Sequence, residues 1–434
     1  MPQRFIIFLF GAIFIIFSAA CGSEFGGNVL NDRQPAQDSD KVKAPGDSPD
    51  QGLAAFKTPT KKLAPNEWPK LIDDLNFSSI ELAIDRQLKR YKQKDLTGTI
   101  QFGADIYKLV EAPKSLTKFR EIVVSYRSCQ KARNRNCQSQ FENQLKENFI
   151  MYIPDLKPDD SRYGESKSAF FTAYYTPQIK VSATPTREFR FPIYAKPSSE
   201  EKAKANTRVD IDFRGALRGQ GLELFYTNDF FYLYLMQVEG SGRAILQTSG
   251  KPISSYLHYG GTNSKSWNFI SKYMLEHNMI SNGSMYAQRK YLNSHPERQE
   301  EIYGSCPSYV YFNKSTKPPM GSDGTAITDN RSIATDKNYY KFKGLLALVA
   351  AERPRENYMG NYIASIKDIR YREFSRFYLD QDTGGAIRGK ARADLYFGEG
   401  DYAALAANSI EHRGDIFFLM IKPNAKLKAS SHKQ

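Results

Sequence analysis

The spacing of apolar positions divides the chain into helical and extended stretches. A helix is expected from Ser78, where Ser-Ser-Ile-Glu fits a capping box that ends at Glu81. Four residues then follow at the spacing of a single helix face: Ile80, Ile84, Leu88 and Tyr91. A second helix is expected at 116–133.

From Phe170 the apolar spacing changes to two, which is typical of strands. Gly and Pro separate the expected strands, which are 170–179, 189–195, 223–225 and 230–238. Residues 266–303 return to a helical pattern, and strands resume at 309–312 and recur as far as Lys422. This order predicts an α+β protein, mainly β, with a β-barrel core and an inserted β domain that has some helices.

The N-terminus has the pattern of an export signal. After Arg4, residues 5–17 form an apolar run of 13 residues, shorter than the roughly 20 needed to span a bilayer. Small residues at 18–20 then precede Cys21, which resembles a bacterial lipobox and implies cleavage before Cys21 and lipidation of its thiol. Gly22 resembles the sorting signal of outer-membrane lipoproteins, so we expect anchoring to that membrane with the protein facing the periplasm. The alternative is an ordinary signal peptide with an incidental Cys21.

Composition narrows the possible partners. The 434 residues suit two or three domains, and residues 22–66 are polar enough to form a disordered tether. The net charge is +14, or +13 without residues 1–20, and a basic surface favours anionic partners, whose binding salt should weaken. Nucleic acid is a poor candidate because the chain is exported and lacks a clustered Arg/Lys motif. We expect no metal and no cofactor, since the sequence has no zinc-site spacing and no phosphate-binding loop.

Export also permits disulfides. Cys129 and Cys137 lie eight residues apart in a basic stretch, and we expect them to pair. Cys306 would then remain as a free, buried thiol.

Residues 380–401 carry the most informative chemistry. Asp382 opens Asp-Thr-Gly-Gly, and Asp394 follows 12 residues later in Arg-Ala-Asp-Leu-Tyr-Phe-Gly. Alternation in a strand would put Asp394 on the face opposite its apolar neighbours, where it could line a cleft and hold a proton near neutral pH. Gly384 and Gly385 permit a tight turn or a close approach of the backbone to a ligand.

This stretch resembles the three-aspartate (3D) domain of the membrane-bound lytic murein transglycosylase A family. Five blocks resemble family motifs, in the family's order: 171–177, 237–243, 306–312, 324–336 and 380–401. Five residues depart from those motifs: Ala173, Thr176, Glu239, Cys306 and Asn330. Glu239 stands where the family motif has Gln.

The resemblance implies a double-psi β-barrel interrupted by a second β domain, with a glycan groove between them. The expected divisions are a lipoprotein signal peptide at 1–20, a tether at 21–66, a helical part and first half of the barrel at 67–177, the inserted β domain at 178–312, the second half of the barrel with the 3D domain at 313–424, and a tail at 425–434.

The implied reaction cleaves the β-1,4 bond between N-acetylmuramic acid and N-acetylglucosamine in peptidoglycan. Asp394 acts first as acid and then as base, and the product is a 1,6-anhydro end. Asp382 would orient groups around Asp394, and Asp401 would do the same or cap a helix starting at Tyr402. The alternatives are a hydrolase that uses water and a non-catalytic, expansin-like wall-binding lipoprotein.

Further residues are candidates for contacting the sugar: Tyr174, Tyr175, Gln237, Gly240, Ser241, Gly242, Thr328, Arg331, Ser332, Gly384, Gly385 and Ala386. The two tyrosines could instead belong to the barrel core, and Arg331 could instead pair with Asp336. The expected partners are glycan strands and the outer membrane, and we expect a monomer that works beside other cell-wall enzymes.

Overall fold

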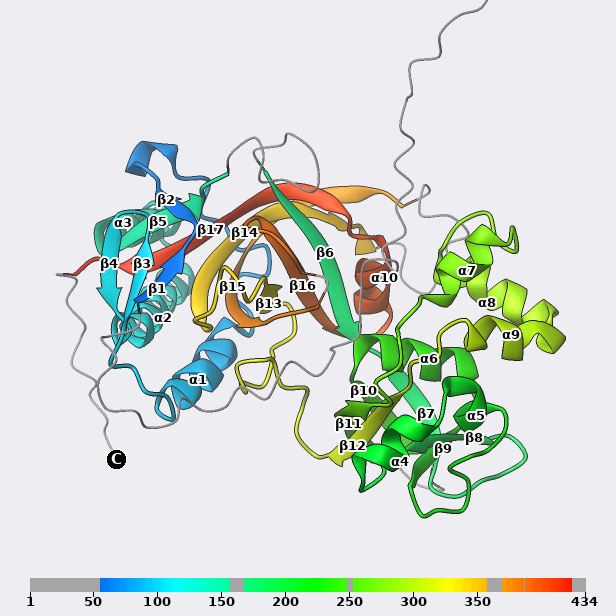
Figure 1. The fold of residues 1–434 in the computed structure, drawn as a ribbon. Helices are drawn as coiled ribbons and strands as arrows, with labels where there is room; N and C mark the ends of the chain where they lie inside the picture. Colours follow the sequence, from blue (N-terminus) through cyan, green and yellow to red (C-terminus); the bar gives the residue numbers. More distant parts are fainter. Residues whose placement is uncertain are drawn as a thin grey trace, which may run out of the picture.

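Two β-sheet domains lie side by side in the computed structural model (Figure 1). The structure describes residues 55–156, 168–246, 248, 253–356, 369–385 and 387–423. The export signal, Cys21 and the 425–434 tail therefore lie outside the described residues. No helix in the described part of the chain is both long enough and apolar enough to cross a membrane.

The larger domain is built on an eight-stranded sheet that closes on itself. Its strands are β2 (Thr60–Lys62), β5 (Phe149–Pro154), β6 (Ala169–Thr176), β13 (Ser332–Thr335), β14 (Leu345–Pro354), β15 (Tyr371–Asp382), β16 (Arg392–Glu399) and β17 (His412–Ile421). They follow the order β14-β15-β13-β16-β6-β17-β5-β2, and β14 also pairs with β17. Within the described residues, this extra pairing joins six strands into a barrel-like ring, as the sequence predicted. The double-psi connection pattern stays a prediction.

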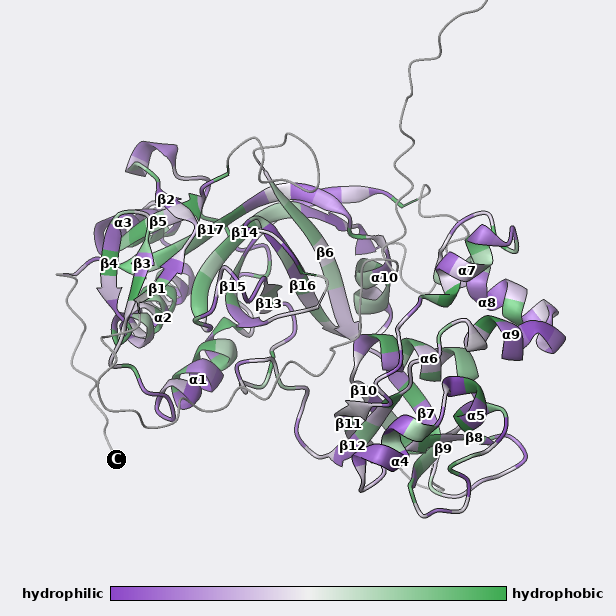
Figure 2. Ribbon diagram, in the orientation of Figure 1, coloured by the Kyte–Doolittle hydropathy of each residue, from purple (hydrophilic) through white to green (hydrophobic). Residues whose placement is uncertain are grey.

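Helices and a small sheet cover one side of this ring (Figure 1). The helices are α1 (Ile80–Tyr91), α2 (Glu111–Lys131) and α3 (Cys137–Asn148), and the small sheet has the order β1 (Ala55–Thr58), β3 (Thr99–Phe102), β4 (Asp105–Lys108). A cluster of buried rings joins the helices to β15: Phe77, Phe119, Phe141 and Phe377. Figure 2 shows that the barrel strand β6 is largely apolar, whereas the outlying helix α9 is largely polar.

The smaller domain is inserted between β6 and β13. Its six-stranded sheet has the order β12 (Val310–Ser315), β11 (Ile253–Thr262), β10 (Gly242–Leu246), β7 (Gln178–Ser182), β9 (Glu223–Thr227), β8 (Phe191–Tyr194). Its helices are α4 (Glu200–Ala205), α5 (Arg208–Asp212), α6 (Phe230–Glu239), α7 (Ile270–Glu276), α8 (Met285–Ser294) and α9 (Gln299–Gly304). Only Pro177 separates β6 from β7, so the two sheets follow each other directly.

The strand expected at 230–238 is wrong, because this segment forms α6. The side chain of Asp229 accepts a hydrogen bond from the backbone of Tyr232 and caps its start, while Gly240, at φ 74°, ends it in the left-handed conformation. Seven of its ten residues are buried. A helix buried on nearly all sides has no polar face to reveal its period, so the sequence did not distinguish it from a strand.

The start of the folded region was also placed wrongly. The tether was expected to reach residue 66, but β1 and β2 occupy Ala55–Thr58 and Thr60–Lys62. The expected capping box at Ser78 is absent as well, because Ser79 is left-handed and its side chain makes no cap hydrogen bond. Glu81 instead forms an ion pair with Arg127 of α2. The second helix begins at Glu111, earlier than the expected residue 116.

The cysteine predictions are confirmed. Cys129 and Cys137 form a disulfide that links the end of α2 to the start of α3. Cys306 is a free thiol with no exposed surface.

A buried ion pair fixes the loop before α1 to the barrel. Arg331 donates to both carboxylate oxygens of Asp73 at 2.6 and 2.9 Å, and neither side chain is exposed. Arg331 also donates to the carbonyls of Ser78 and Phe377. Burial by itself would raise the pKa of Asp73, but the hydrogen bonds and charge of Arg331 outweigh it and lower the pKa.

We predict that Arg331→Met lowers the free energy of unfolding by about 3–5 kcal/mol, because it strands a buried carboxylate. Urea unfolding followed by circular dichroism measures the change. The matched control is Arg120→Met, which breaks the exposed pair with Asp85 and should cost less than about 1 kcal/mol. Equal losses in the two variants would contradict the prediction.

The same pair predicts how stability responds to acid. The folded-state pKa of Asp73 is lowered, so the stability that it contributes is present above the unfolded pKa of 3.8 and is lost as the pH falls through the folded value. Thermal melts between pH 7 and pH 2 should therefore fall less steeply in the double variant Asp73→Leu/Arg331→Met than in the unaltered protein.

Candidate active site

Four neighbouring strands of the ring bring the site residues into one row. Asp382 at the end of β15 is opposite Ala334 of β13, Ala334 is opposite Asp394 of β16, and Asp394 is opposite Thr172 of β6. Residues opposite one another in a sheet point to the same face. The backbones of the two aspartates are two strand spacings apart, or about 10 Å. Because Ala334 is small, the space between the two carboxyl groups stays open.

Asp394 lies in this row between Ala334 and Thr172, with 7% of its surface exposed. The Thr172 hydroxyl donates to Oδ1 of Asp394 at 2.6 Å. Arg392 in turn donates from Nη2 to that hydroxyl oxygen at 2.8 Å, so the hydroxyl proton is directed at the carboxyl group. The pair of hydrogen bonds fixes one oxygen of Asp394 from β6.

Asp382 is held by three donors. The backbone N–H groups of Ser322 and Thr383 each donate to Oδ1 at 2.8 Å, and the Tyr174 hydroxyl donates to Oδ2 at 3.1 Å. Burial raises the pKa of Asp382 above its ordinary value, and these hydrogen bonds and the charge of Lys343 oppose the rise. Burial, and then the charges of Asp382 and Asp394, raise the pKa of Tyr174 well above its usual value. Its hydroxyl therefore stays protonated and able to donate.

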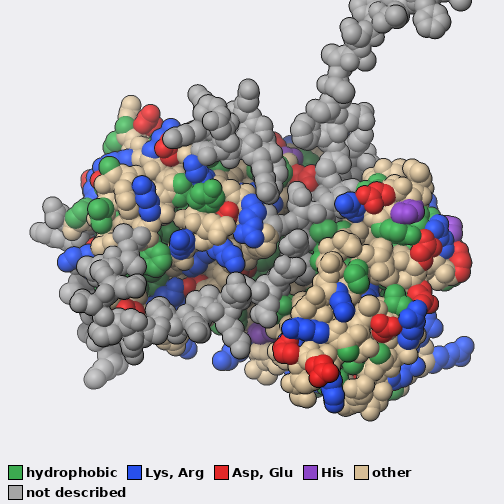
Figure 3. Space-filling model, in the orientation of Figure 1, with side chains coloured by type: hydrophobic (Ala, Val, Ile, Leu, Met, Phe, Trp, Pro, Cys, Tyr) green, Lys and Arg blue, Asp and Glu red, His purple; other side chains and the backbone are tan. Residues whose placement is uncertain are grey.

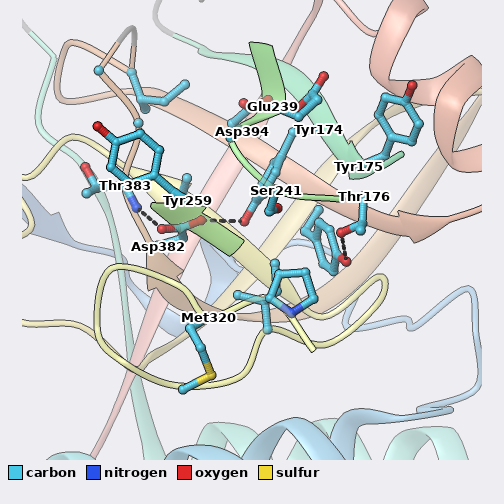
Figure 4. A pocket seen from close by; sticks show the side chains of 18 of the residues that line it. Tyr174, Tyr175, Thr176, Glu239, Ser241, Tyr259, Met320, Asp382, Thr383 and Asp394 are labelled. Carbon is cyan, nitrogen blue, oxygen red and sulfur yellow. Dashed lines mark hydrogen bonds between the residues drawn. The ribbon is translucent and has the colours of Figure 1, made fainter. Parts of the chain in front are cut away.

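A cleft of about 390 Å³ opens above the two aspartates (Figure 4). Its barrel side is lined by Tyr174, Tyr175, Thr176, Asp382, Asp394 and Tyr396. Its insert side is lined by Val238, Glu239, Gly240, Ser241, His258 and Tyr259. The loop before β13 adds Pro319, Met320 and Ile327, and the turn after β15 adds Thr383, Gly384, Gly385 and Ile387. A volume of this size is typical of small-ligand sites between domains.

Hydrogen bonds join the two domains at one edge of the cleft. Glu399, the last residue of β16, accepts from Arg243 of β10 at 2.7 Å and from Gln178 of β7 at 2.8 Å. The ring of Tyr396 lies against that of Tyr174, with centroids 5.0 Å apart, and its hydroxyl is 2.6 Å from that of Thr176. Barrel strands thus form this part of the cleft wall, and the hydrogen bonds of Glu399 tie it to strands of the insert.

The structure brings eight of the expected site residues to the cleft: Asp394, Asp382, Tyr174, Tyr175, Gly240, Ser241, Gly384 and Gly385. Tyr175 is only 5% exposed and also belongs to the barrel core. Ala386 lies outside the described residues.

Five expected contacts lie away from the cleft, and these are corrections. Gln237 is buried within α6, and Gly242 packs so closely on Met236 that a Cβ would lie 2.3 Å from its sulfur. Thr328 accepts from Arg86, and Ser332 donates to Gln381 beneath the site.

Arg331 is the fifth residue that does not reach the cleft, because it is fully buried and pairs with Asp73. The alternative expectation, an ion pair between Arg331 and Asp336, was wrong too. That partner, Asp336, lies instead near Arg388 at 3.7 Å.

Asp401 does not cap a helix as expected. It is the first residue of α10 (Asp401–Ser409), where Gly400 holds the cap position and no side-chain cap forms. Its side chain is exposed and does not line the cleft.

Sequence reasoning missed several lining residues. Ala334 depends on strand register and His258 on the path of β11, and neither stands out in the sequence. Glu239 was noticed only as a departure from a motif. In the part of the chain that the structure describes, no group of three or more His, Cys, Asp or Glu is placed to hold a metal ion.

Comparison with known proteins agrees with this architecture. The MltA specific insert domain matches residues 170–313, and the 3D domain matches residues 331–420. Membrane-bound lytic murein transglycosylase A of Vibrio cholerae is 29% identical over 256 residues, which cover 58% of this chain and 65% of that protein. A homolog from Buchnera aphidicola is 27% identical over 265 residues, covering 60% and 68%. The chain thus spans just under two thirds of the length of the Vibrio relative.

A solved structure extends the likeness to most of the fold. E. coli MltA with bound chitohexaose superposes with a TM-score of 0.60 at 21% identity, covering 85% of this chain and 96% of that one. The fold and the site define a class of protein in which a 3D-domain barrel carries the aspartates and an inserted β domain forms the opposite wall of the cleft. The chain belongs to the membrane-bound lytic murein transglycosylase A family.

We predict that Tyr174→Phe raises the pKa of Asp382 further above its ordinary value, because it removes one of three donors to the carboxylate. The carboxyl ¹³C resonance of labelled aspartate, titrated by NMR and assigned with Asp382→Asn, gives the pKa directly. Tyr226→Phe, a change far from the carboxylate on β9, is the control. An unchanged titration in Tyr174→Phe would show that its hydrogen bond does not hold Asp382 in solution.

Proposed function

We propose that the protein is a peptidoglycan lytic transglycosylase. It cleaves the β-1,4 bond between N-acetylmuramic acid and N-acetylglucosamine and leaves a 1,6-anhydro end. The observation that carries this proposal is the carboxyl group of Asp394, which lines an inter-domain cleft, is 7% exposed and is fixed through one oxygen by Thr172. A shielded, oriented carboxyl group facing a ligand-sized cleft suits general acid–base work.

The first step breaks the glycosidic bond. Protonated Asp394 gives its proton to the bridging oxygen, the bond from that oxygen to the muramic C1 breaks, and the N-acetylglucosamine leaves with a new hydroxyl. Positive charge develops at C1. The carboxylate of Asp382, which lies across Ala334 from Asp394 in the same row, stabilises that charge electrostatically.

The second step closes the ring. The C6 hydroxyl of the same muramic residue gives its proton to the ionised Asp394, and O6 bonds to C1. Asp394 thereby regains the proton that it donated, so one carboxyl group serves both steps. The nucleophile belongs to the substrate, so its effective concentration is high and no water is consumed.

The other cleft residues position the sugar. We propose that Tyr174 and Tyr259 offer ring faces to the pyranose, and that Ser241 and the backbone at Gly384 and Gly385 offer hydrogen bonds. A relative of the same fold was solved with chitohexaose, which supports a cleft that takes a linear sugar chain.

The remaining expectations complete the proposal. The barrel-like ring is a double-psi β-barrel, and lipid on Cys21 anchors the protein to the outer membrane. There it faces the periplasm as a monomer and acts on glycan strands beside other cell-wall enzymes. Two acyl chains or more suffice for stable anchoring.

We predict that Asp394→Asn lowers the release of muropeptides from purified sacculi by about 10²–10⁴-fold, since the amide can neither donate nor recover the proton. Chromatography of released material measures the rate. Asp401→Asn makes the same change at an exposed acid outside the cleft and should retain activity. Equal release by Asp394→Asn and the unaltered protein would end the proposal, and no release by either would favour the non-catalytic, wall-binding alternative.

Product mass distinguishes transglycosylation from hydrolysis. The proposed product is lighter than the hydrolytic product by one water, and mass spectrometry of the released ends resolves the two. Reducing muramic ends would show that water is the nucleophile.

We predict that Thr172→Val lowers kcat by about tenfold and changes KM little, because the lost hydrogen bond orients the acid rather than the sugar. Valine has nearly the shape of threonine, so we do not expect the structure of the protein to change. Thr172→Ser keeps the hydroxyl and should restore most of the rate; a rise in KM alone would contradict the assigned role.

A further inference from the structure

The cleft differs in charge from the protein around it. The chain has a net charge of +14, and Figure 3 shows Lys and Arg side chains spread over the visible face of both domains. The described lining of the cleft includes no Lys or Arg. It includes the carboxyl groups of Asp382, Asp394 and Glu239, and His258 is its one side chain that can become cationic.

The insert side of the cleft adds a negative helix end. Glu239 is the last residue of α6, and Val238, Glu239, Gly240 and Ser241 line the cleft in succession. The carbonyl groups at the end of a helix carry a partial negative charge of about half an elementary charge. Glu239 therefore adds its carboxyl group where the helix is already negative, and it lines the same cleft as the barrel aspartates (Figure 4).

In the glycan strands of peptidoglycan, the lactyl group of a muramic residue can be either charged or neutral. In a peptide-free strand, the lactyl group of each muramic residue ends in a carboxylate. In a peptide-bearing strand, an amide bond caps the same group, so no charge stands beside the ring. An anion brought against fixed carboxylates in a partly dry cleft is repelled strongly, because water screens the interaction poorly there.

We propose that the cleft selects glycan segments whose lactyl carboxyl groups are capped as amides, and that Glu239 is the residue that sets this selection. The choice of polymer rests on the proposed function, whereas the selection by charge rests on the lining itself. The sequence alone predicted that salt weakens binding, from net charge. Within the cleft the sign is opposite for uncapped strands, because salt screens repulsion.

Binding of matched probes tests the proposal. One probe is peptide-free glycan strands, and the other is the same strands after chemical conversion of the lactyl carboxyl groups to amides. Both are titrated by calorimetry into full-length protein that carries Asp394→Asn, so that no strand is cut. We expect the amidated strands to bind about three- to tenfold more tightly at low ionic strength. This ratio of affinities, called the gap below, should narrow as salt is added.

Two further variants assign the effect. Glu239→Gln, which restores the residue of the family motif and keeps the side-chain shape, should reduce the gap by about threefold or more. Glu276→Gln removes the same charge from an exposed side chain at the end of α7, outside the cleft lining, and should leave the gap unchanged.

Equal binding of the two probes overturns the selection, and a gap that Glu239→Gln leaves at full size overturns the role of Glu239. A normal gap, together with no release from sacculi by the protein with Asp394 intact, would instead defeat the proposed function and leave the selection standing.

Discussion

The site depends on closure of the six-strand ring. Pairing of β14 with β17 leaves each ring strand hydrogen-bonded on both sides, so no strand can slide without breaking two ladders. That constraint fixes the row of Asp382, Ala334, Asp394 and Thr172, contributed by strands that are far apart in sequence. Hydrogen bonds from Thr172 and Tyr174 then fix the carboxyl groups. The chemistry follows from register first and from side-chain contacts second.

Local signals were enough for much of the fold. The period-two stretches, the helical stretch at 266–303 and the spacing of the cysteines each reflect a preference that operates over a few residues. The prediction of secondary structure was wrong where the local sequence carries no periodic signal or where tertiary contacts override its preference. Helix α6 is apolar on nearly all sides and shows no period, and Ser79 adopts a left-handed conformation at a position where the capping motif predicts otherwise.

The site shows the same division. Asp382 and Asp394 are visible in a motif, but Ala334 matters only because register puts it between them. Arg331, Thr328 and Ser332 belong to another motif block, 324–336, and turn out to support the barrel. A motif preserves both the residues that touch a ligand and those that hold the scaffold, and spacing alone does not separate the two. Burial and partners do, and they exist only after folding.

The short link at Pro177 has a mechanical consequence. The last barrel residue of β6, Thr176, and the first insert residue, Gln178, are separated by that single proline, whose carbonyl also accepts from the backbone of Arg243. A rotation of the insert would pull on the backbone that carries Tyr174 and Thr172. The insert wall of the cleft and the strand that carries the Thr172–Asp394 hydrogen bond are therefore mechanically coupled, so that a shift of one would displace the other.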